Sequence, residues 1–199
     1  MNKNHHLAVT SNGNKTELRE NAFKLRKDCS KTTINNFSKI IFDNLLRHFD
    51  FENKNIHLFF PIEEKNEVNT WYLYESINLK STLHTSLFNE KTKLWECVKL
   101  SRTNKFKISK FNIPSPRKYR ISKLSEIDYI IVPLLCFDRV GNRVGYGKGI
   151  YDKILNEINS KCVKIGVSIL DCSEIKIDSE QHDIQLDYCQ TPNKLYRFQ

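Results

Sequence analysis

The spacing of apolar residues predicts four helices in this chain. Apolar side chains recur every three or four positions in each of four segments, which is the period of one helix face. The segments are Lys15–Cys29, a helix that follows an interruption at Ser30–Thr33, Glu67–Ile77 and Ile150–Ile158. Their apolar positions are, in order, Leu18, Ala22, Leu25 and Cys29; Phe37, Ile40, Ile41, Leu45 and Leu46; Val68, Trp71, Tyr72 and Ile77; and Ile150, Ile154, Leu155 and Ile158.

Five shorter apolar runs predict strands. These runs are Asn55–Phe60, Ser81–Phe88, Trp95–Leu100, Ile127–Val132 and Cys162–Ile169. The run IDYIIV at Ile127–Val132 shows no alternation, which is typical of a central strand covered on both faces. Lys105–Arg120 has two prolines and no period, so we predict a loop there, and short turns in the tail. Helices alternating with strands predict an α/β fold, a three-layer αβα sandwich with a mostly parallel central sheet.

Length and composition indicate an ordinary globular protein. The 199 residues, 39% of them hydrophobic, suit a single domain over residues 15–199 after a flexible polar leader at 1–14. The longest apolar run, Tyr129–Phe137, is far shorter than the ~20 residues that span a bilayer, so we expect no membrane segment. Six cysteines without C-x-x-C spacing and an N-terminus without an apolar core favour reduced thiols in a cytoplasmic protein. We expect a monomer.

A net charge of +9 leaves the kind of partner open. It suits a polyanion, an anionic substrate such as a nucleotide, or simply a solvated, lysine-rich surface. A nucleic-acid-binding module that uses the basic first helix is one alternative. No helix-turn-helix, ribonucleoprotein motif or zinc finger supports it.

A glycine cluster after the central strand predicts a phosphate site. Four of the six glycines, Gly141, Gly145, Gly147 and Gly149, fall within nine residues that lead into a predicted helix. Glycine lets backbone N–H groups approach an anion, and a helix N-terminus adds donors and a positive dipole end. Arg143 and Lys148 add positive charge. The spacing matches neither GxGxxG nor a P-loop, and a tight turn that only reverses the chain is the alternative.

Asp152 in the first turn of that helix has two interpretations. A carboxylate there complements the helix dipole. It is equally suited to bind Mg²⁺ beside phosphates.

Three segments of the chain resemble those of a known protein family. The run PLLCFDRVGNRVGYGKGIYD is similar to the P-G-x-x-F-D-x-x-G-x-R-L-G-x-G-x-G-Y-Y-D signature of 5-formyltetrahydrofolate cyclo-ligases. Two distant segments also match in the family's order. KTELR at 15–19 resembles an N-terminal K-x-x-L-R, and HDIQLD at 182–187 with Thr191 resembles H-D-x-x-x-D…T.

The resemblance implies an ATP- and Mg²⁺-dependent enzyme that converts 5-formyltetrahydrofolate to 5,10-methenyltetrahydrofolate. It implies that Lys148 and Arg143 act in catalysis and that Asp152 and Asp183 bind Mg²⁺. Residues matching the family's ATP site are Lys15, Arg19, Arg143, Val144, Gly145, Tyr146, Gly147, Lys148, Gly149, Ile150 and Tyr151. Those matching its folate site are Phe60, Glu67, Tyr146, Gly147, Lys148, Gly149 and Ile150. A polyglutamate tail on the folate would suit the basic surface.

Each of these assignments has a simpler alternative. Lys15 and Arg19, one helical turn apart, can form a solvated face, Glu67 can be an acid at a helix N-terminus, and Asp183 can be a turn residue. Ile150 replaces the family's first tyrosine, and Pro133-Leu134-Leu135 replaces its Pro-Gly. These departures leave open an enzyme with the same ATP site and another acceptor.

Overall fold

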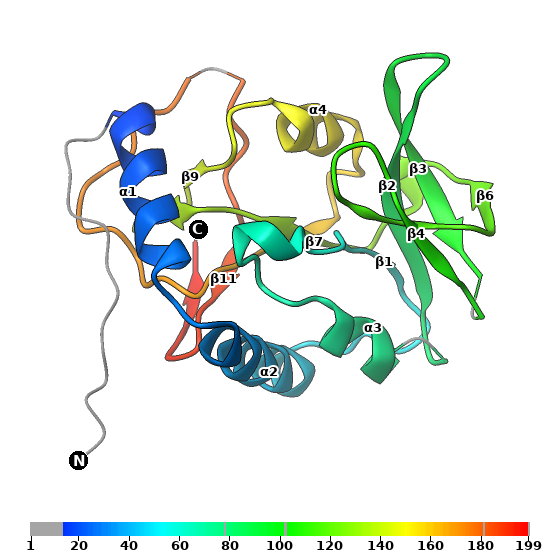
Figure 1. Cartoon of the computed structure of the whole chain (residues 1–199), viewed down its shortest axis with the longest axis horizontal. Coiled ribbons are helices and arrows are strands. Elements are labelled where there is room, and N and C mark those ends of the chain that lie inside the picture. Colours follow the sequence, from blue (N-terminus) through cyan, green and yellow to red (C-terminus); the bar gives the residue numbers. More distant parts are fainter. Residues whose placement is uncertain (1–13, 78, 102, 181, 199) are drawn as a thin grey trace.

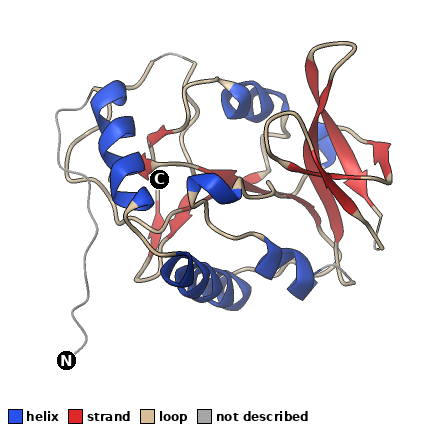
Figure 2. Ribbon diagram, in the orientation of Figure 1, coloured by secondary structure: helices blue, strands red, loops and turns tan. Residues whose placement is uncertain are grey.

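The computed structural model describes residues 14–77, 79–101, 103–180 and 182–198, and it places helices on both faces of an eight-stranded sheet (Figures 1 and 2). The α-helices are α1 (Lys15–Lys27), α2 (Lys31–His48), α3 (Trp71–Ile77) and α4 (Ile150–Glu157). The strands are β1 (Asn55–His57), β2 (Thr82–Asn89), β3 (Leu94–Leu100), β4 (Phe106–Ile108), β5 (Pro114–Pro116), β6 (Tyr119–Ile121), β7 (Tyr129–Pro133), β8 (Cys136–Phe137), β9 (Arg143–Val144), β10 (Val163–Val167), β11 (Tyr188–Gln190) and β12 (Leu195–Arg197). Two single-turn 3₁₀ helices, η1 (Glu63–Lys65) and η2 (Leu124–Glu126), complete the set.

The sheet has a parallel centre and antiparallel edges. Its strand order is β12-β11-β10-β7-β1-β2-β3-β6, and the neighbours from β11 through β2 run parallel. The outer strands β12, β3 and β6 pair antiparallel. The predicted α/β fold with a mostly parallel central sheet is confirmed.

Alternate residues of β7 divide the core between the two faces of the sheet. Ile131 packs with the apolar residues of α1, α2 and α3, whereas Ile130 and Val132 pack with Ile154 and Leu155 of α4. Figure 1 shows α4 on one side of β7 and α2 and α3 on the other. This is the predicted three-layer arrangement, and β7 has the apolar run without alternation because both its faces are covered.

The first two helices begin at polar caps. The Asn14 side chain accepts a hydrogen bond from the Thr16 N–H, and Ser30 does the same for Thr33. Ser30–Thr33 therefore starts α2, whereas the sequence had indicated an interruption. The buried stripe of α2 also differs from the predicted one, because Ile40 is 42% exposed. That stripe consists of Ile34, Ser38, Ile41, Phe42 and Leu45.

Three further predictions concern the rest of the chain. The loop predicted at Lys105–Arg120 is wrong, since it contains β4, β5 and the start of β6, and the tail contains β11 and β12 besides turns. Strands of three residues are too short to show a period in the sequence. Whether such a segment forms a strand depends on the strand it pairs with in the folded chain. The leader predicted at residues 1–14 lies outside the described residues except for Asn14. Among the described helices, none has both the length and the apolar sequence needed to cross a bilayer.

The strand order reverses between β1 and β7. From β1 the chain continues to β2 on one side, whereas β7 continues to β10 and β11 on the other side. In open α/β sheets the crevice outside the carboxyl ends of the strands at such a reversal is where ligands bind. The residues that follow β1 and β7 therefore face each other across this crevice.

Two buried histidines predict a pH-dependent stability. His57 and His84 are register partners on β1 and β2 and are 0% and 1% exposed. Burial, together with His84, lowers the pKa of His57 to about 3, and burial and the nearby Lys99 lower the pKa of His84 to about 4. The unfolded chain therefore binds more protons than the folded one below about pH 6.5.

We expect the free energy of unfolding to fall as the pH drops from about 6.5 to about 4, by up to about 1.4 kcal/mol per pH unit for each histidine. Urea unfolding at pH 7, 6 and 5 measures this slope. His84→Asn should reduce it, and His48→Gln, at an exposed position, should not. A stability that is flat over this range would contradict the prediction.

Candidate functional site

A cavity of about 680 Å³ opens at the carboxyl ends of β1 and β7. Its wall combines α1, the loop after β1, the β2–β3 hairpin, the segment from Arg143 to Asp152, and Asp183 with its neighbours. The same cavity contains every site residue predicted from the sequence: Lys15, Arg19, Phe60, Glu67, Arg143, Val144, Gly145, Tyr146, Gly147, Lys148, Gly149, Ile150, Tyr151, Asp152 and Asp183. The fold thus brings together four segments that are separated in the sequence, 15–19, 60–67, 143–152 and the region of Asp183, although the role of each residue stays a prediction.

The glycine loop follows a short hairpin made by β8 and β9. Gly147 and Gly149 have φ angles of +78° and +62°, a left-handed conformation that side chains disfavour. A Cβ on Gly147 would lie 3.3 Å from the guanidinium carbon of Arg19, whose Nε donates to the Gly145 carbonyl at 2.9 Å. Since every residue from Arg143 to Asp152 lines the cavity, the loop forms part of the cavity wall as well as a turn.

Arg143 joins this loop to α4 and to the C-terminal segment. Its side chain is buried, donates to Asp152 Oδ1 at 2.5 Å and also donates to the Ile184 carbonyl. Burial lowers the pKa of Arg143, and the carboxylates of Asp152 and Asp183 oppose that shift. Asp152 thus lies in the first helical turn, as the dipole interpretation requires, and also neutralises a buried guanidinium.

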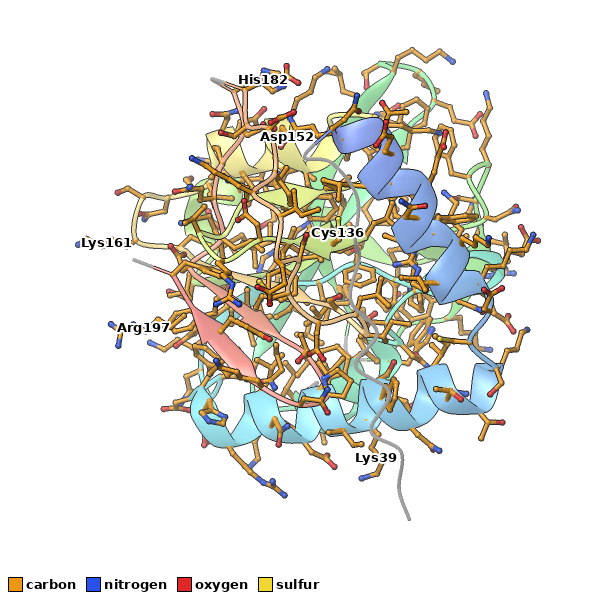
Figure 3. The ribbon with its side chains drawn as sticks, turned by 90° about the vertical axis from the view of Figure 1, so that its left-hand side faces the viewer. Lys39, Cys136, Asp152, Lys161, His182 and Arg197 are labelled. Carbon is orange, nitrogen blue, oxygen red and sulfur yellow. The ribbon has the colours of Figure 1, made fainter. Side chains whose placement is uncertain are left out.

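Lys15 pairs with the second predicted metal ligand. Its Nζ lies 2.5 Å from Asp183 Oδ2 and 3.2 Å from Glu180 Oε1. Burial alone would raise the pKa of Asp183, but hydrogen bonds from the Glu180 backbone and from Lys15 hold it below its usual value. Asp183 is also a turn residue, as the alternative suggested, because its N–H donates to the Glu180 carbonyl at 3.0 Å. Figure 3 shows Asp152 and His182 at the same end of the molecule, next to one end of α1.

The donor set suits a hard cation that arrives with phosphates. Among the described residues, no group of three or more metal-binding side chains is found. Mg²⁺ needs only one or two carboxylates when phosphate oxygens and water complete its shell. Asp152 and Asp183 both act on Arg143 from the same cavity, so they meet this requirement.

Glu67 lies in the part of the cavity wall that is formed by the segment between β1 and α3. It is 6% exposed, its Oε2 accepts from the Ile62 N–H at 2.5 Å, and it precedes α3 by four residues. The interpretation as an acid in a helix's first turn is therefore wrong. Burial and the Glu67 carboxylate raise the pKa of Tyr146 well above that of a free phenol. The Tyr146 hydroxyl also accepts from Arg26.

Arg26 is a site-supporting residue that the sequence did not indicate. It is 4% exposed, although the other basic residues of the first helix are exposed or half-buried. Besides contacting Tyr146, it donates to the Leu134 carbonyl at 3.2 Å. Its signals in the sequence were its place four residues after Ala22 on the apolar side of the helix and its place in the basic run Leu25-Arg26-Lys27, which resembles a second basic element of the family.

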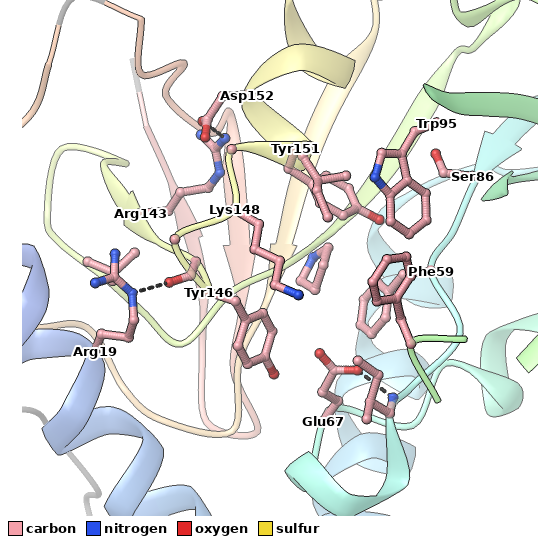
Figure 4. Close-up of a pocket in the computed structure, with 18 of the residues that line it drawn as sticks. Arg19, Phe59, Glu67, Ser86, Trp95, Arg143, Tyr146, Lys148, Tyr151 and Asp152 are labelled. Atoms are coloured by element: carbon pink, nitrogen blue, oxygen red, sulfur yellow. Dashed lines mark hydrogen bonds and ion pairs between the residues drawn. The ribbon is translucent and has the colours of Figure 1, made fainter. Parts of the chain in front are cut away.

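Aromatic side chains form the other half of the cavity. Phe59, Trp95, Phe111 and Tyr151 line it, and the rings of Trp95 and Phe111 stack with their centroids 5.9 Å apart. Figure 4 shows Tyr151 directed toward Trp95 and Ser86 and away from Arg143, and Lys148 reaching into the same half. Sequence reasoning missed Phe59, Trp95 and Phe111 because strand and loop aromatics usually pack in a core. Trp71 is such a core residue, and its ring centroid lies 4.5 Å from that of Phe60.

These features define an α/β protein with a two-part ligand cavity, cationic at one end and aromatic at the other, at the switch point of its sheet. A sequence model described as the 5-formyltetrahydrofolate cyclo-ligase family matches residues 11–192. The chain belongs to this family, as its glycine-rich run predicted.

Individual relatives agree. The chain is 36% identical to a 5-formyltetrahydrofolate cyclo-ligase of Mycoplasma genitalium over 63 residues, which are 32% of this chain but only 38% of that relative. It is 27% identical to the Haemophilus influenzae protein of the same name over 139 residues, 67% of this chain and 73% of that protein. The solved structure of Aquifex aeolicus 5,10-methenyltetrahydrofolate synthetase superposes with a TM-score of 0.78 at 25% identity, covering 93% of both chains.

The glycine loop gives a direct test of its geometry. We expect Gly147→Ala to destabilise the protein by about 1–2 kcal/mol, because φ at this position is positive and the new methyl group meets Arg19. Gly145→Ala is the matched control, since its Cβ would meet nothing within 4 Å and its φ is not positive. Chemical unfolding of both variants measures the difference. Equal losses at the two positions would show that the loop is not held in this conformation.

Proposed function

We propose that this protein is an ATP- and Mg²⁺-dependent ligase that cyclises 5-formyltetrahydrofolate to 5,10-methenyltetrahydrofolate, releasing ADP and phosphate. The observation that carries the proposal is that a single cavity, in a member of the cyclo-ligase family, joins a cationic glycine loop to an aromatic wall. The first feature suits a triphosphate and the second a planar ring system.

The chemistry requires both parts at once. The N5-formyl oxygen is a poor leaving group, so ring closure needs it to be activated. Transfer of the γ-phosphoryl group from ATP to that oxygen gives ADP and an iminium phosphate. N10 then attacks the formyl carbon and releases its proton to solvent, and phosphate leaves with the former formyl oxygen as the methenyl bridge forms. Such catalysis consists mainly of positioning and of neutralising charge.

The cationic half supplies the neutralisation. We assign the ATP phosphates to the N–H groups of the glycine loop, the N-terminus of α4 and the side chains of Lys15, Arg19 and Arg143. Asp152 and Asp183 would hold Mg²⁺, which supplies further positive charge to the phosphoryl oxygens. The ion pairs to Arg143 and Lys15 keep both carboxylates at the cavity wall.

The aromatic half is assigned to the folate. Phe60, Glu67, Lys148 and the loop from Tyr146 to Ile150 face it, and planar rings gain from packing on aromatic side chains. Ile150, where the family has tyrosine, is half-buried and packs against the apolar cluster that includes Ile154 and Leu155 of α4. The family tyrosine's hydroxyl is therefore absent, while the apolar contact with the core is kept.

The protein's excess positive charge lies beside this half. Residues 97–125 contain nine lysines and arginines and no acidic residue, whereas the rest of the chain carries 23 of each sign. The eight of these basic residues that the structure describes are all exposed: Lys99, Lys105, Lys107, Lys110, Arg117, Lys118, Arg120 and Lys123. Phe111 and Ile113 of the same segment line the cavity. An anionic tail leaving the cavity on this side would meet Lys107 and Lys110, so we assign this surface to the glutamates of the folate.

The activity itself is the first test. Purified protein with MgATP and 5-formyltetrahydrofolate should develop the near-ultraviolet absorbance of the methenyl product. Lys148→Ala and Asp152→Ala should lower kcat/KM by about 10²-fold or more, as loss of a charge-stabilising group does. Lys148→Ala should leave the free energy of unfolding unchanged, whereas Asp152→Ala should also lower it, because the buried Arg143 loses its partner. Lys153→Ala, at the exposed neighbouring position, is the control.

A folded wild-type protein that gives no signal at high concentration would refute the folate assignment. ATP-dependent turnover of another formyl or carboxamide compound would then select a different acceptor for the same site.

The tail assignment makes a separate prediction. The double variant Lys107→Glu/Lys110→Glu should raise KM for a polyglutamylated substrate by about tenfold, because attraction becomes repulsion, while KM for the monoglutamate changes little. Lys161→Glu is the control, since Lys161 is exposed and is not part of the cavity lining. Added salt should shrink the effect. Equal KM values for both substrates in the wild type would remove the assignment.

A further inference from the structure

His57 lies beneath the aromatic half of the cavity, with both of its neighbours in the cavity wall. Its side chain is fully buried, and its Nε2 is 2.8 Å from Oγ of Ser86 on β2. Its ring meets that of Tyr151 edge to face, with centroids 6.3 Å apart. Ser86 and Tyr151 both line the cavity. The imidazole therefore supports the wall from behind without facing the ligand itself.

The direction of the His57–Ser86 hydrogen bond follows from the other ring nitrogen. Burial lowers the pKa of His57 to about 3, so the ring is neutral and carries one proton. Among the described residues, Nδ1 of His57 is buried and has no hydrogen-bond partner. A buried N–H without an acceptor is rarer in folded proteins than an acceptor without a donor. The proton therefore lies on Nε2, which donates to Ser86 Oγ.

If His57 donates this hydrogen bond, the Ser86 hydroxyl keeps its own proton to donate to an atom in the cavity. The Ser86 oxygen accepts from His57, and no other hydrogen bond of the Ser86 side chain is found among the described residues. Figure 4 shows Ser86 beside Trp95, with Tyr151 and Phe59 nearby. A single oriented donor thus stands within a wall that is otherwise aromatic.

We propose that Ser86 is a substrate-contacting hydrogen-bond donor, and that His57 is the positioning residue that orients it. The partner is an acceptor atom, a carbonyl oxygen or an unprotonated ring nitrogen, of the planar ring held between the aromatic side chains. The identity of that ring as the folate's rests on the proposed function, whereas the direction of the hydrogen bond does not. A ring without an acceptor at this edge leaves the donor unpaired and binds less well.

The kinetic experiment separates contact from support. Ser86→Ala should raise KM for 5-formyltetrahydrofolate by about 3- to 10-fold, the usual effect of one neutral hydrogen bond, with KM for ATP unchanged. His57→Phe should raise the same KM to a similar extent. The double variant should add little to either, since the two residues act as one unit.

Two further variants distinguish positioning from a general loss of packing. His57→Gln places an N–H donor at the reach of Nε2 and should restore most of the folate affinity. His84→Phe replaces the neighbouring buried histidine, which contacts Asn55 outside the cavity lining, and should leave KM for the folate unchanged. Additive effects of Ser86→Ala and His57→Phe, or a KM that does not respond to Ser86→Ala, would overturn the proposal.

A measurement on the wild type tests the hydrogen bond without any activity. The imidazole ¹⁵N spectrum should show His57 protonated at Nε2 and unprotonated at Nδ1 at neutral pH. The opposite tautomer would overturn the assignment of Ser86 as a donor. If the wild type forms no methenyl product, the proposed function fails, and this spectrum still decides whether Ser86 presents a donor to the cavity.

Discussion

The arrangement of the site depends on the ion pair and the hydrogen bond that the buried guanidinium of Arg143 makes. An unpaired charge in such surroundings would cost several kcal/mol, so its partners have to stay in place. Those partners are Asp152 at the start of α4 and the Ile184 carbonyl in the C-terminal segment. Since Arg143 begins the glycine loop, one side chain links this loop to the helix that follows it and to a C-terminal segment 41 residues further along the chain. The backbone donors of the loop are held in position before any ligand arrives.

Two more arginines extend this support along the loop. Arg19 binds the Gly145 carbonyl, and Arg26 binds the Tyr146 hydroxyl and the Leu134 carbonyl. All three interactions use the fixed, multiply donating guanidinium, which lysine does not offer. Lysines instead lie where charge is needed without fixed geometry, as at Lys148 and on the exposed surface of residues 97–125.

The cavity separates two kinds of recognition. At one end, cations, carboxylates and backbone N–H groups suit phosphates and a hard metal ion. At the other end, aromatic rings are interrupted by a few polar groups: Lys148, Glu67, which the Ile62 N–H holds, and Ser86, which is hydrogen-bonded to His57. The meeting point is the segment from Tyr146 to Tyr151, whose residues face both ends. A reaction that transfers a phosphoryl group onto a bound ring compound needs such a junction, since its barrier is lowered mainly by positioning.

Much of the fold was predictable because long elements carry their own pattern. α1, α2, α4, β7 and β10 are long or apolar enough for periodicity to reveal them. The three-residue strands β4, β5, β6, β11 and β12 are not, because their stability comes from pairing with partners found only in the folded chain. Pro114 and Pro116 made β5 look like a loop, although proline is tolerated in an edge strand such as this one.

The sequence by itself determined the α/β class and, through three matching segments, the family, and it predicted an anion site at the glycine loop. These features depend on local period, on backbone freedom at glycine and on residue order, all of which are present before folding. Only the tertiary structure decided that Arg26 and Arg143 are buried, and that Asp152 and Asp183 pair with the side chains of Arg143 and Lys15. It also decided that three aromatic residues face a cavity: Phe59, Trp95 and Phe111. It also placed His57 behind Ser86. Burial and pairing depend on which distant segments meet, and that is set by the order of the strands in the sheet.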